Sequence, residues 1–331
     1  MDSADDPQRD LFGGPSARTI EAAPPRPEHQ ALAARLPAGV RLGTASWSFP
    51  GWIGSVYGEG AKAKHLAGDG LTAYARHPLL RSVEIDRTYY DPLSPAAFRA
   101  YAEQVPEDFR FLVKAHEECT VRRFPVHARY GKKRGETNTR YLDAAYATDV
   151  VVAAATEGLG SKLGALLFQF PPQEAGEPGA FADELHAFHS RLPGGIPYAV
   201  EIRNAALLTP AYAAALEDCG AVHCHNGWTA MPPVLAQARQ IPPAARRPLV
   251  VRWLLPQGLA YEDAVRHYAP FDRIVTEDPA SRVALATLVA KASMHGVPGL
   301  VIVDNKAEGC APESIVRLAG AIASARDVLH V

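Results

Sequence analysis

Short apolar runs alternate along the chain with longer stretches in which apolar residues recur every three to four positions. Apolar runs of this kind, bounded by polar residues, glycine and proline, are typical of strands covered on both faces, as in parallel sheets. Eight of them predict strands over residues 40–45, 82–85, 110–115, 164–168, 198–202, 221–224, 249–253 and 300–303.

Helical patterns lie between most of these strands. One begins near Ser94, a residue type that caps helices, with Pro95 in the first turn. Others are expected over residues 141–155, 180–192, 211–219, 279–296 and 314–325. This alternation predicts an α/β fold, a single TIM-type (β/α)8 barrel over residues 38–331. No glycine-rich phosphate-binding motif follows a predicted strand, which disfavours an open nucleotide-binding sheet.

The composition fits one soluble barrel. The chain has 331 residues, of which 47% are hydrophobic and 21% charged, and its formal net charge is −2. Its four cysteines form no CxxC pair, so neither a disulfide framework nor a zinc site is expected, and a reducing, cytoplasmic location is the default. No apolar run approaches the ~18 residues of a membrane span, and the acidic N-terminus does not resemble a secretory signal.

Residues 1–37 are rich in proline and poor in large apolar residues. Such a segment buries too little apolar surface to offset the entropy of ordering, so we expect a disordered tail. Within it, Gln8, Leu11 and Phe12 are similar to the short peptides that dock into the bacterial DNA sliding clamp. The clamp is therefore a possible partner, and a chance Leu-Phe pair is the alternative explanation.

Charged side chains follow the carboxyl ends of several predicted strands. Because side chains alternate across a strand, Val83 and Ile85 should face the helices, while Glu84 and Asp86 face the barrel axis. The same alternation sends Glu201 and Arg203 inward. Other polar residues close further strands, namely Lys114, Gln169, Arg252, Asp304, Asn305 and Lys306.

A barrel would gather these residues at one mouth, where barrel enzymes place their active sites. We expect Glu84, Glu201 and Asp304 to be catalytic, with Glu84 and Glu201 as acid and base. Lys114, Gln169, Arg203, Arg252, Asp86, Asn305 and Lys306 would bind a phosphorylated or polyhydroxylated substrate. The alternative is a network of ion pairs that only fills the barrel, because buried charges must be paired.

Aromatic residues follow the first predicted strand. Trp47, Trp52 and Tyr57 lie in a loop that would stand over the polar mouth. Large rings there suit stacking against a sugar or a base, and a hydrophobic lid is the alternative.

A basic loop follows the third predicted strand. Seven Lys and Arg fall within residues 122–140, where Glu136 is the only acid. A basic loop with interleaved aromatic residues suits contact with phosphate backbones, although a solvated loop has the same pattern. The predicted polyanion-binding residues are Arg122, Arg123, Lys132, Lys133 and Arg134.

No metal site and no cofactor are predicted. Glu84, Asp86, Glu201, His223, His225 and Asp304 are residue types that bind metals in barrel enzymes. However, Lys114, Arg203 and Arg252 would repel a cation at the same mouth. Two carboxylates could instead flank a glycosidic bond, and Glu84 and Glu201 are the candidate pair for such chemistry.

Several segments together resemble the YecE-like family, the domain of unknown function numbered seventy-two. The similar segments are residues 43–47, 50–52 with Tyr57, 83–90, 111–115, 163–172 and 199–203, in order along the chain. The resemblance covers about residues 40–330 and implies a TIM-type barrel. It implies no established reaction. The chain departs from the family pattern at Asp86, where asparagine is expected, and at residues 251–254 and 304–306.

Two hypotheses follow. In the first, the protein is a hydrolase- or lyase-type enzyme that binds its substrate at the barrel mouth. In the second, it is a non-catalytic module associated with nucleic acid through the basic loop and the tail. An open pocket beside Glu84, Glu201 and Arg252 would favour the enzyme, whereas a mouth filled by ion pairs is compatible with the module.

Overall fold

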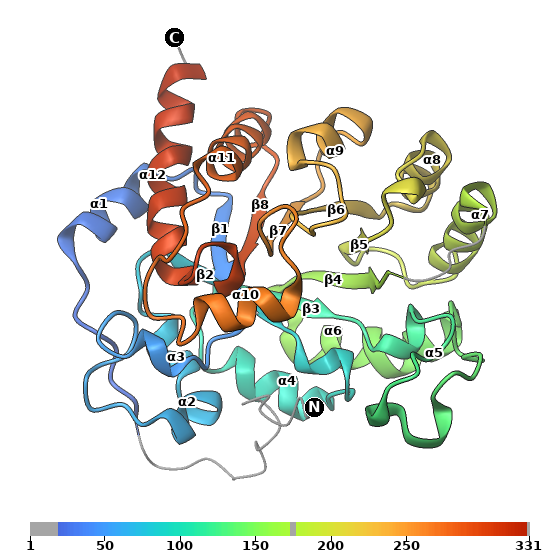
Figure 1. Cartoon of the computed structure of the whole chain (residues 1–331), viewed down its shortest axis with the longest axis horizontal. Helices are drawn as coiled ribbons and strands as arrows, with labels where there is room; N and C mark the ends of the chain where they lie inside the picture. The colour runs from blue at the N-terminus through green and yellow to red at the C-terminus, as the bar shows by residue number, and fades with distance from the viewer. Residues whose placement is uncertain (1–18, 173–176, 330–331) are drawn as a thin grey trace.

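The computed structural model describes residues 19–172 and 177–329, which form a closed barrel of parallel strands (Figure 1). The strands follow one another around the barrel in sequence order, and the last pairs with the first. They are β1 (Val40–Thr44), β2 (Leu80–Ile85), β3 (Arg110–Lys114), β4 (Leu163–Phe170), β5 (Tyr198–Ile202), β6 (Val222–Asn226), β7 (Leu249–Trp253) and β8 (Gly299–Val303). The predicted fold is confirmed, with strand ends within two residues of those expected.

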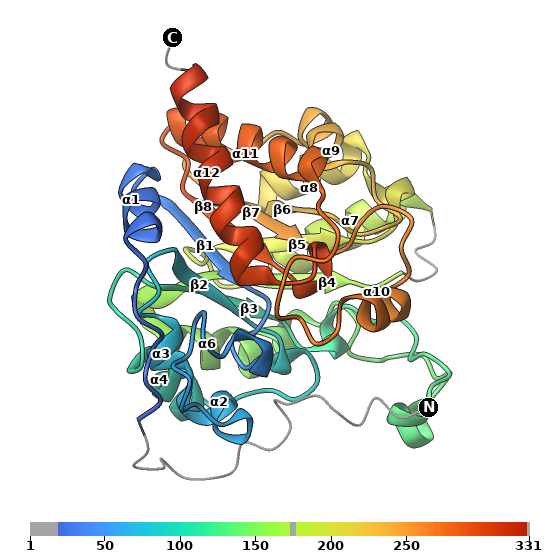
Figure 2. The same ribbon diagram turned by 60° about the vertical axis from the view of Figure 1, so that its left-hand side comes forward.

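At least one helix follows every strand and covers the outside of the barrel (Figures 1 and 2). The helices are α1 (Pro27–Arg35), α2 (Ala63–Asp69), α3 (Leu71–Tyr74), α4 (Pro95–Ala102), α5 (Ala144–Tyr146), α6 (Ala153–Leu159), α7 (Pro178–His189), α8 (Pro210–Cys219), α9 (Val234–Gln240), α10 (Tyr261–Tyr268), α11 (Pro279–Met294) and α12 (Ala311–Leu329). Ser94 caps α4 as expected, because its hydroxyl accepts a hydrogen bond from the backbone N–H of Ala97.

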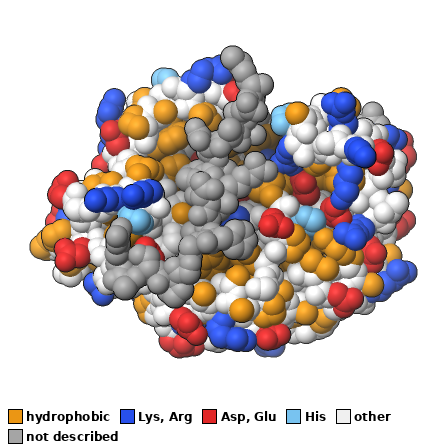
Figure 3. Space-filling model, turned by 90° about the horizontal axis from the view of Figure 1, so that it is seen from below, with side chains coloured by type: hydrophobic (Ala, Val, Ile, Leu, Met, Phe, Trp, Pro, Cys, Tyr) orange, Lys and Arg blue, Asp and Glu red, His pale blue; other side chains and the backbone are white. Residues whose placement is uncertain are grey.

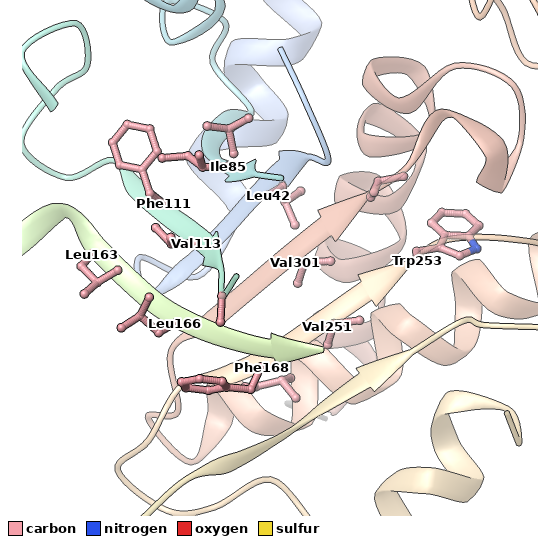
Figure 4. Packing of buried hydrophobic residues seen from close by; sticks show 14 of the residues in the cluster. Leu42, Ile85, Phe111, Val113, Leu163, Leu166, Phe168, Val251, Trp253 and Val301 are labelled. Carbon is pink, nitrogen blue, oxygen red and sulfur yellow. The ribbon is translucent and has the colours of Figure 1, made fainter. Parts of the chain in front are cut away.

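Side-chain alternation along the strands divides the core into two parts. Outward side chains such as Ile85, Phe111 and Val113 pack with the surrounding helices (Figure 4). A second, smaller apolar cluster comes from the alternate positions and fills the barrel interior: Leu112, Ala165, Leu167, Ala199, Val222, Cys224, Val250, Leu300 and Ile302. The apolar interior supports the polar residues that project at the carboxyl ends of the strands.

The N-terminal boundary of the ordered chain differs from the prediction. Residues 19–37 were expected in a disordered tail, but they pack on the barrel. Ile20 is buried, the N–H of Ala23 donates to the carbonyl of Val56, and α1 packs against α12. This arm closes one side of a cavity of about 160 Å³ that also involves His77. Apolar contacts at only a few positions are sufficient to order the arm because the barrel offers a preformed surface.

None of the helices in the described part of the chain is long and apolar enough to cross a membrane.

Gly43 is expected to be essential for the close packing of β1 on β2. A Cβ at this position would lie 2.0 Å from the backbone oxygen of Ser82, so the two strands would have to separate. Gly43→Ala should therefore lower the free energy of unfolding by about 1–3 kcal/mol or more. Gly60→Ala is the control, because an added Cβ there meets no atom within 4 Å. Equal stability of the two variants in urea unfolding would contradict this packing constraint.

Candidate active site

A single arginine joins two carboxylates across the end of the barrel. Arg252, on β7, donates from Nε and Nη2 to the two oxygens of Glu84 on β2, at 2.9 and 2.8 Å. Its Nη1 donates to Oε2 of Glu201 on β5, at 2.6 Å. Arg203 donates to the other oxygen of Glu201 at 2.8 Å and to Gln169 on β4 at 3.0 Å. We call Glu84, Arg252, Glu201, Arg203 and Gln169 the axial network.

Two ion pairs lie beside the axial network and closer to solvent. The Nζ of Lys114 donates to Oδ1 of Asp86 at 2.6 Å, and the Nζ of Lys306 lies 2.7 Å from Oδ1 of Asp304. Glu84 and Glu201 are 0% exposed, whereas the side chain of Asp86 is 33% exposed. A ligand arriving at the mouth would therefore meet the outer pairs first.

The two buried carboxyl groups have opposite electrostatic environments. Burial raises the pKa of Glu84 to about 7, and the attraction of Arg252 offsets burial only in part. Burial would also raise the pKa of Glu201, but Arg252 and Arg203 together outweigh burial and lower this pKa to about 2. Glu201 therefore stays ionised, while Glu84 can exchange a proton near neutral pH. A pair of carboxyl groups whose pKa values are separated in this way is typical of acid–base sites.

The structure brings the predicted mouth residues together. Glu84, Glu201, Arg203, Arg252 and Gln169 share hydrogen bonds, and Lys114 and Asp86 act electrostatically on Glu84. Asn305 is buried, and its Oδ1 accepts from Trp52 Nε1 at 3.3 Å and from the N–H of Ala311 at 2.8 Å. Its Nδ2 has no hydrogen-bond partner among the described residues. A buried amide N–H without a partner is costly, so this donor is suited to an incoming acceptor.

The predicted stacking role of Trp47, Trp52 and Tyr57 is corrected by the structure. All three side chains are 0% exposed and belong to the main core. Trp47 Nε1 donates to the carbonyl of Ala67 at 3.2 Å, and the Tyr57 hydroxyl donates to the carbonyl of Trp47. The loop after β1 folds inward because these rings fill the space between the barrel and the helices, so none of them can stack on a ligand here.

Other aromatic rings lie at the mouth, where Tyr90 and Tyr261 are exposed and Trp228 is half-buried. Tyr90 follows β2, Trp228 follows β6, and Tyr261 begins α10, which Figure 2 shows set apart from α11 and α12. Each ring has a cation on one face: Arg129 over Tyr90, Arg203 over Trp228 at 3.9 Å, and Lys306 over Tyr261. The position of Tyr90 and Trp228 just after a strand could have indicated from the sequence that they lie at the mouth. Nothing in the local sequence indicates this for Tyr261.

The two candidate histidine ligands lie apart from the carboxylates of the mouth. His223 and His225 do share a face of β6, but they point into the layer between the barrel and the helices. His223 bonds to Tyr212 and Gln237, and His225 bonds to the carbonyl of Ile241. Burial lowers the pKa of His223 to about 4 and that of His225 to about 3. Over residues 19–172 and 177–329, no three His, Cys, Asp or Glu side chains gather in an arrangement that could hold a metal ion.

The basic loop is partly neutralised by acids that lie outside it. Arg122 pairs with Glu184 on α7, Arg129 with Glu117, and both Lys133 and Arg140 pair with Glu118. Figure 3 likewise shows Lys and Arg intermixed with Asp and Glu on the face that it views. Arg123 donates to the carbonyl of Gly135 at 2.6 Å. The capacity to contact phosphates therefore rests mainly on Arg123, Lys132 and Arg134.

Gln8, Leu11 and Phe12, the residues of the predicted clamp-binding motif, lie outside the described residues.

The raised pKa of Glu84 predicts a specific pH dependence of stability. Between about pH 4.5 and 7 the folded protein binds the proton of Glu84 and the unfolded chain does not, so this group lowers stability as pH rises. Buried histidines with lowered pKa raise stability as pH rises. Their contribution is the same in the wild type and in a Glu84→Gln variant, so it cancels when the two are compared. The difference in unfolding free energy, wild type minus variant, should therefore fall from pH 4.5 to 7 in chemical denaturation. A constant difference would show that Glu84 is ionised throughout.

The basic loop is predicted to bind polyanions weakly. Single-stranded DNA should bind with a logarithm of affinity that falls by roughly 0.7 per phosphate neutralised as the logarithm of salt concentration rises. The combined change of Arg123, Lys132 and Arg134 to Ala should remove most of this slope. The control is Arg122→Ala with Glu184→Ala, which deletes an ion pair without changing net charge and should preserve the slope. Equal losses in both variants would contradict the assignment.

The chain is similar to solved structures of DUF72 family proteins from Thermotoga maritima and Enterococcus faecalis. The first has a TM-score of 0.56 and 18% identity, covering 88% of this chain and 99% of that chain. The second has a TM-score of 0.53 and 18% identity, covering 86% and 95%. Likeness at this identity shows the shared barrel fold. No curated protein matches the chain.

The family resemblance seen in the sequence motifs is confirmed over nearly the whole barrel. Residues 41–330 match the family described as "Protein of unknown function DUF72", and the chain therefore belongs to the DUF72 family.

Proposed function

We propose that the protein is an enzyme of the hydrolase or lyase type, with its active site at the barrel mouth. The observation that carries this proposal is the sharing of Arg252 by two carboxyl groups with opposite pKa shifts. In this assignment Glu84 becomes the general acid when Arg252 releases one of its two oxygens and that oxygen takes up a proton. Glu201 is ionised before the reaction, and it stabilises positive charge on the substrate or accepts a proton from it. Asp304, paired with Lys306, is a third carboxylate within the same group of charges.

The proposed substrate is phosphorylated or polyhydroxylated. Lys114, Arg203 and Lys306 supply positive charge at the mouth, and the outer oxygens of Asp86 and Asp304 suit hydroxyl groups. The buried Nδ2 of Asn305 is a further donor for a substrate oxygen.

Substrate binding must open the axial network before chemistry can occur, because Glu84 and Glu201 have no exposed surface. Arg203 offers the route. It is 13% exposed and holds one oxygen of Glu201, so an anionic group that binds this guanidinium would compete with Glu201 for it. If an anionic group of the substrate replaced Glu201 on Arg203, the arginine would remain paired. The released carboxylate oxygen of Glu201 would then be accessible to the substrate.

The non-catalytic module remains the second candidate function, and the complete burial of Glu84 and Glu201 in ion pairs is the observation that favours it. In that case the axial network would be structural, and the basic loop would contact nucleic acid, with Gln8, Leu11 and Phe12 as the proposed contact to the sliding clamp. We also propose a reducing, cytoplasmic setting, since all four cysteines are free.

The enzyme proposal predicts that Glu84→Gln lowers turnover by about 10²–10⁴-fold, the usual contribution of a general acid. The assay would screen phosphorylated sugars, nucleotides and chromogenic phosphate esters and glycosides. Wild-type activity should fall as pH rises through about 7, because Glu84 then loses its proton. Glu107→Gln is the control, because its side chain is 79% exposed and distant from the mouth. Wild-type activity in a folded Glu84→Gln variant would favour the non-catalytic module.

A further inference from the structure

The exposed aromatic rings of the described chain are gathered at one place. Large apolar side chains with substantial exposure in residues 19–172 and 177–329 include only two aromatic residues, Tyr90 at 47% and Tyr261 at 52%. Both lie at the barrel mouth, one after β2 and the other at the start of α10. Most other aromatic residues of the described chain belong to the core, so these two rings are the aromatic surfaces most accessible to a ligand.

The two rings share one electrostatic environment with the outer ion pairs. Partial burial raises the pKa of Tyr90, and the next contributions come from Asp86, which raises it, and from Arg129 and Tyr261. Lys306 is held by Asp304 and lies over the ring of Tyr261 at 4.7 Å. Asp86 acts electrostatically on both Tyr90 and Lys306, so the two rings belong to the same group of charges at the mouth.

Each ring has a cation over one face, and about half of each residue remains exposed. Arg129 lies over Tyr90 at 4.8 Å from the ring centre, and the ring of Tyr89 meets Tyr90 edge-on at 5.3 Å. Arg129 is itself held by Glu117, as Lys306 is by Asp304. The rings are thus fixed in position before any ligand arrives, which reduces the entropy lost on binding.

The cations over the two tyrosine rings also influence which ligand groups stack well on them. A positive charge on one face draws electron density from an aromatic ring, because the attraction acts on its π electrons. An electron-poor ring is a weak partner for the C–H groups of a sugar and a good partner for the face of an electron-rich base. Stacking of a base on an aromatic side chain contributes about 1–3 kcal/mol per base in proteins that bind single-stranded nucleic acid.

We propose that the ligand of the mouth is a purine nucleoside phosphate, whose base stacks on Tyr90 and Tyr261 and whose phosphate binds Arg203 and the neighbouring lysines. This inference rests on the proposed function, since it names the substrate class of the same site. Asp86 and Asp304 border the space that the ribose would occupy, and their carboxylate oxygens accept hydrogen bonds from its hydroxyl groups.

The test compares adenosine 5′-monophosphate with ribose 5-phosphate, which has the same sugar and phosphate but no base. Calorimetric titration of the full chain should show adenosine 5′-monophosphate binding at least 10-fold more tightly. Tyr90→Ala and Tyr261→Ala should each weaken it about 5-fold or more, as expected for loss of a stacked base. Both should leave ribose 5-phosphate unaffected, and Tyr90→Phe and Tyr261→Phe should retain the wild-type affinity. Arg203→Met should weaken both ligands.

The outcomes separate this inference from the proposed function. Equal affinity for the two ligands, with Arg203→Met weakening both and the tyrosine variants weakening neither, would overturn the nucleotide assignment while leaving an anion site at the mouth. An equal loss of affinity for both ligands in the tyrosine variants would also overturn it, because the rings would then not contact the base specifically. Absence of binding by either ligand at millimolar concentration would overturn the inference, and it would leave the proposed active site without its predicted substrate class. Circular dichroism of each variant establishes that it is folded.

Discussion

The mouth of this barrel is organised around the contact of Arg252 with Glu84 and Glu201. The arginine is on β7 and the two carboxylates are on β2 and β5, so three strands that are not neighbours are joined across the axis. Removing Arg252 alone would leave two buried carboxyl groups without their shared partner, and breaking a buried pair in this way costs about 3–5 kcal/mol. The relative positions of the strand ends, and of every loop that leaves them, depend on this contact.

Stability alone is a poor explanation for such a network. Replacing buried ion pairs by well-packed apolar residues is often neutral or stabilising, because charges lose their hydration when they are buried. The barrel has an apolar interior of this kind directly alongside, with Leu112 paired to Glu84 and Ile302 paired to Arg252 in the strand register. Charged residues at the end where barrel enzymes bind their substrates therefore favour a functional role.

The sequence was sufficient to predict the strands and the inward direction of Glu84, Asp86, Glu201 and Arg203, because alternation along a strand is a local property. The burial of Trp47, Trp52 and Tyr57 was not predictable in this way. It depends on how the loop after β1 packs against α2 and the barrel, which local periodicity does not contain. The same holds for residues 19–37, whose order comes from the surface that α12 and the loop after β1 provide.

The number of charged residues along the sequence overstates the positive charge that the basic loop has available, for a related reason. The basic loop appears strongly positive within residues 122–140, but Glu117 and Glu118 precede it and Glu184 comes from α7. Pairing across elements decides how much of that charge is available to a ligand. Tyr261 likewise reaches the mouth only because α10 lies there, and the sequence of α10 does not indicate its neighbour Lys306.

Exposure rises stepwise from the axis of the barrel outward, and this gradient favours a ligand site over a network of ion pairs that only fills the barrel. Glu84 and Glu201 are 0% exposed, Asp86 is 33% exposed, and Tyr261 is 52% exposed. A network that only filled the barrel would be covered by apolar or neutral residues, since every further charge near it must also be desolvated. Here further ion pairs and cation-bearing rings are placed over it instead. Because these outer pairs are still partly hydrated, they can exchange a protein partner for a ligand at small cost, while the buried pair keeps the separation of pKa values that acid–base chemistry needs.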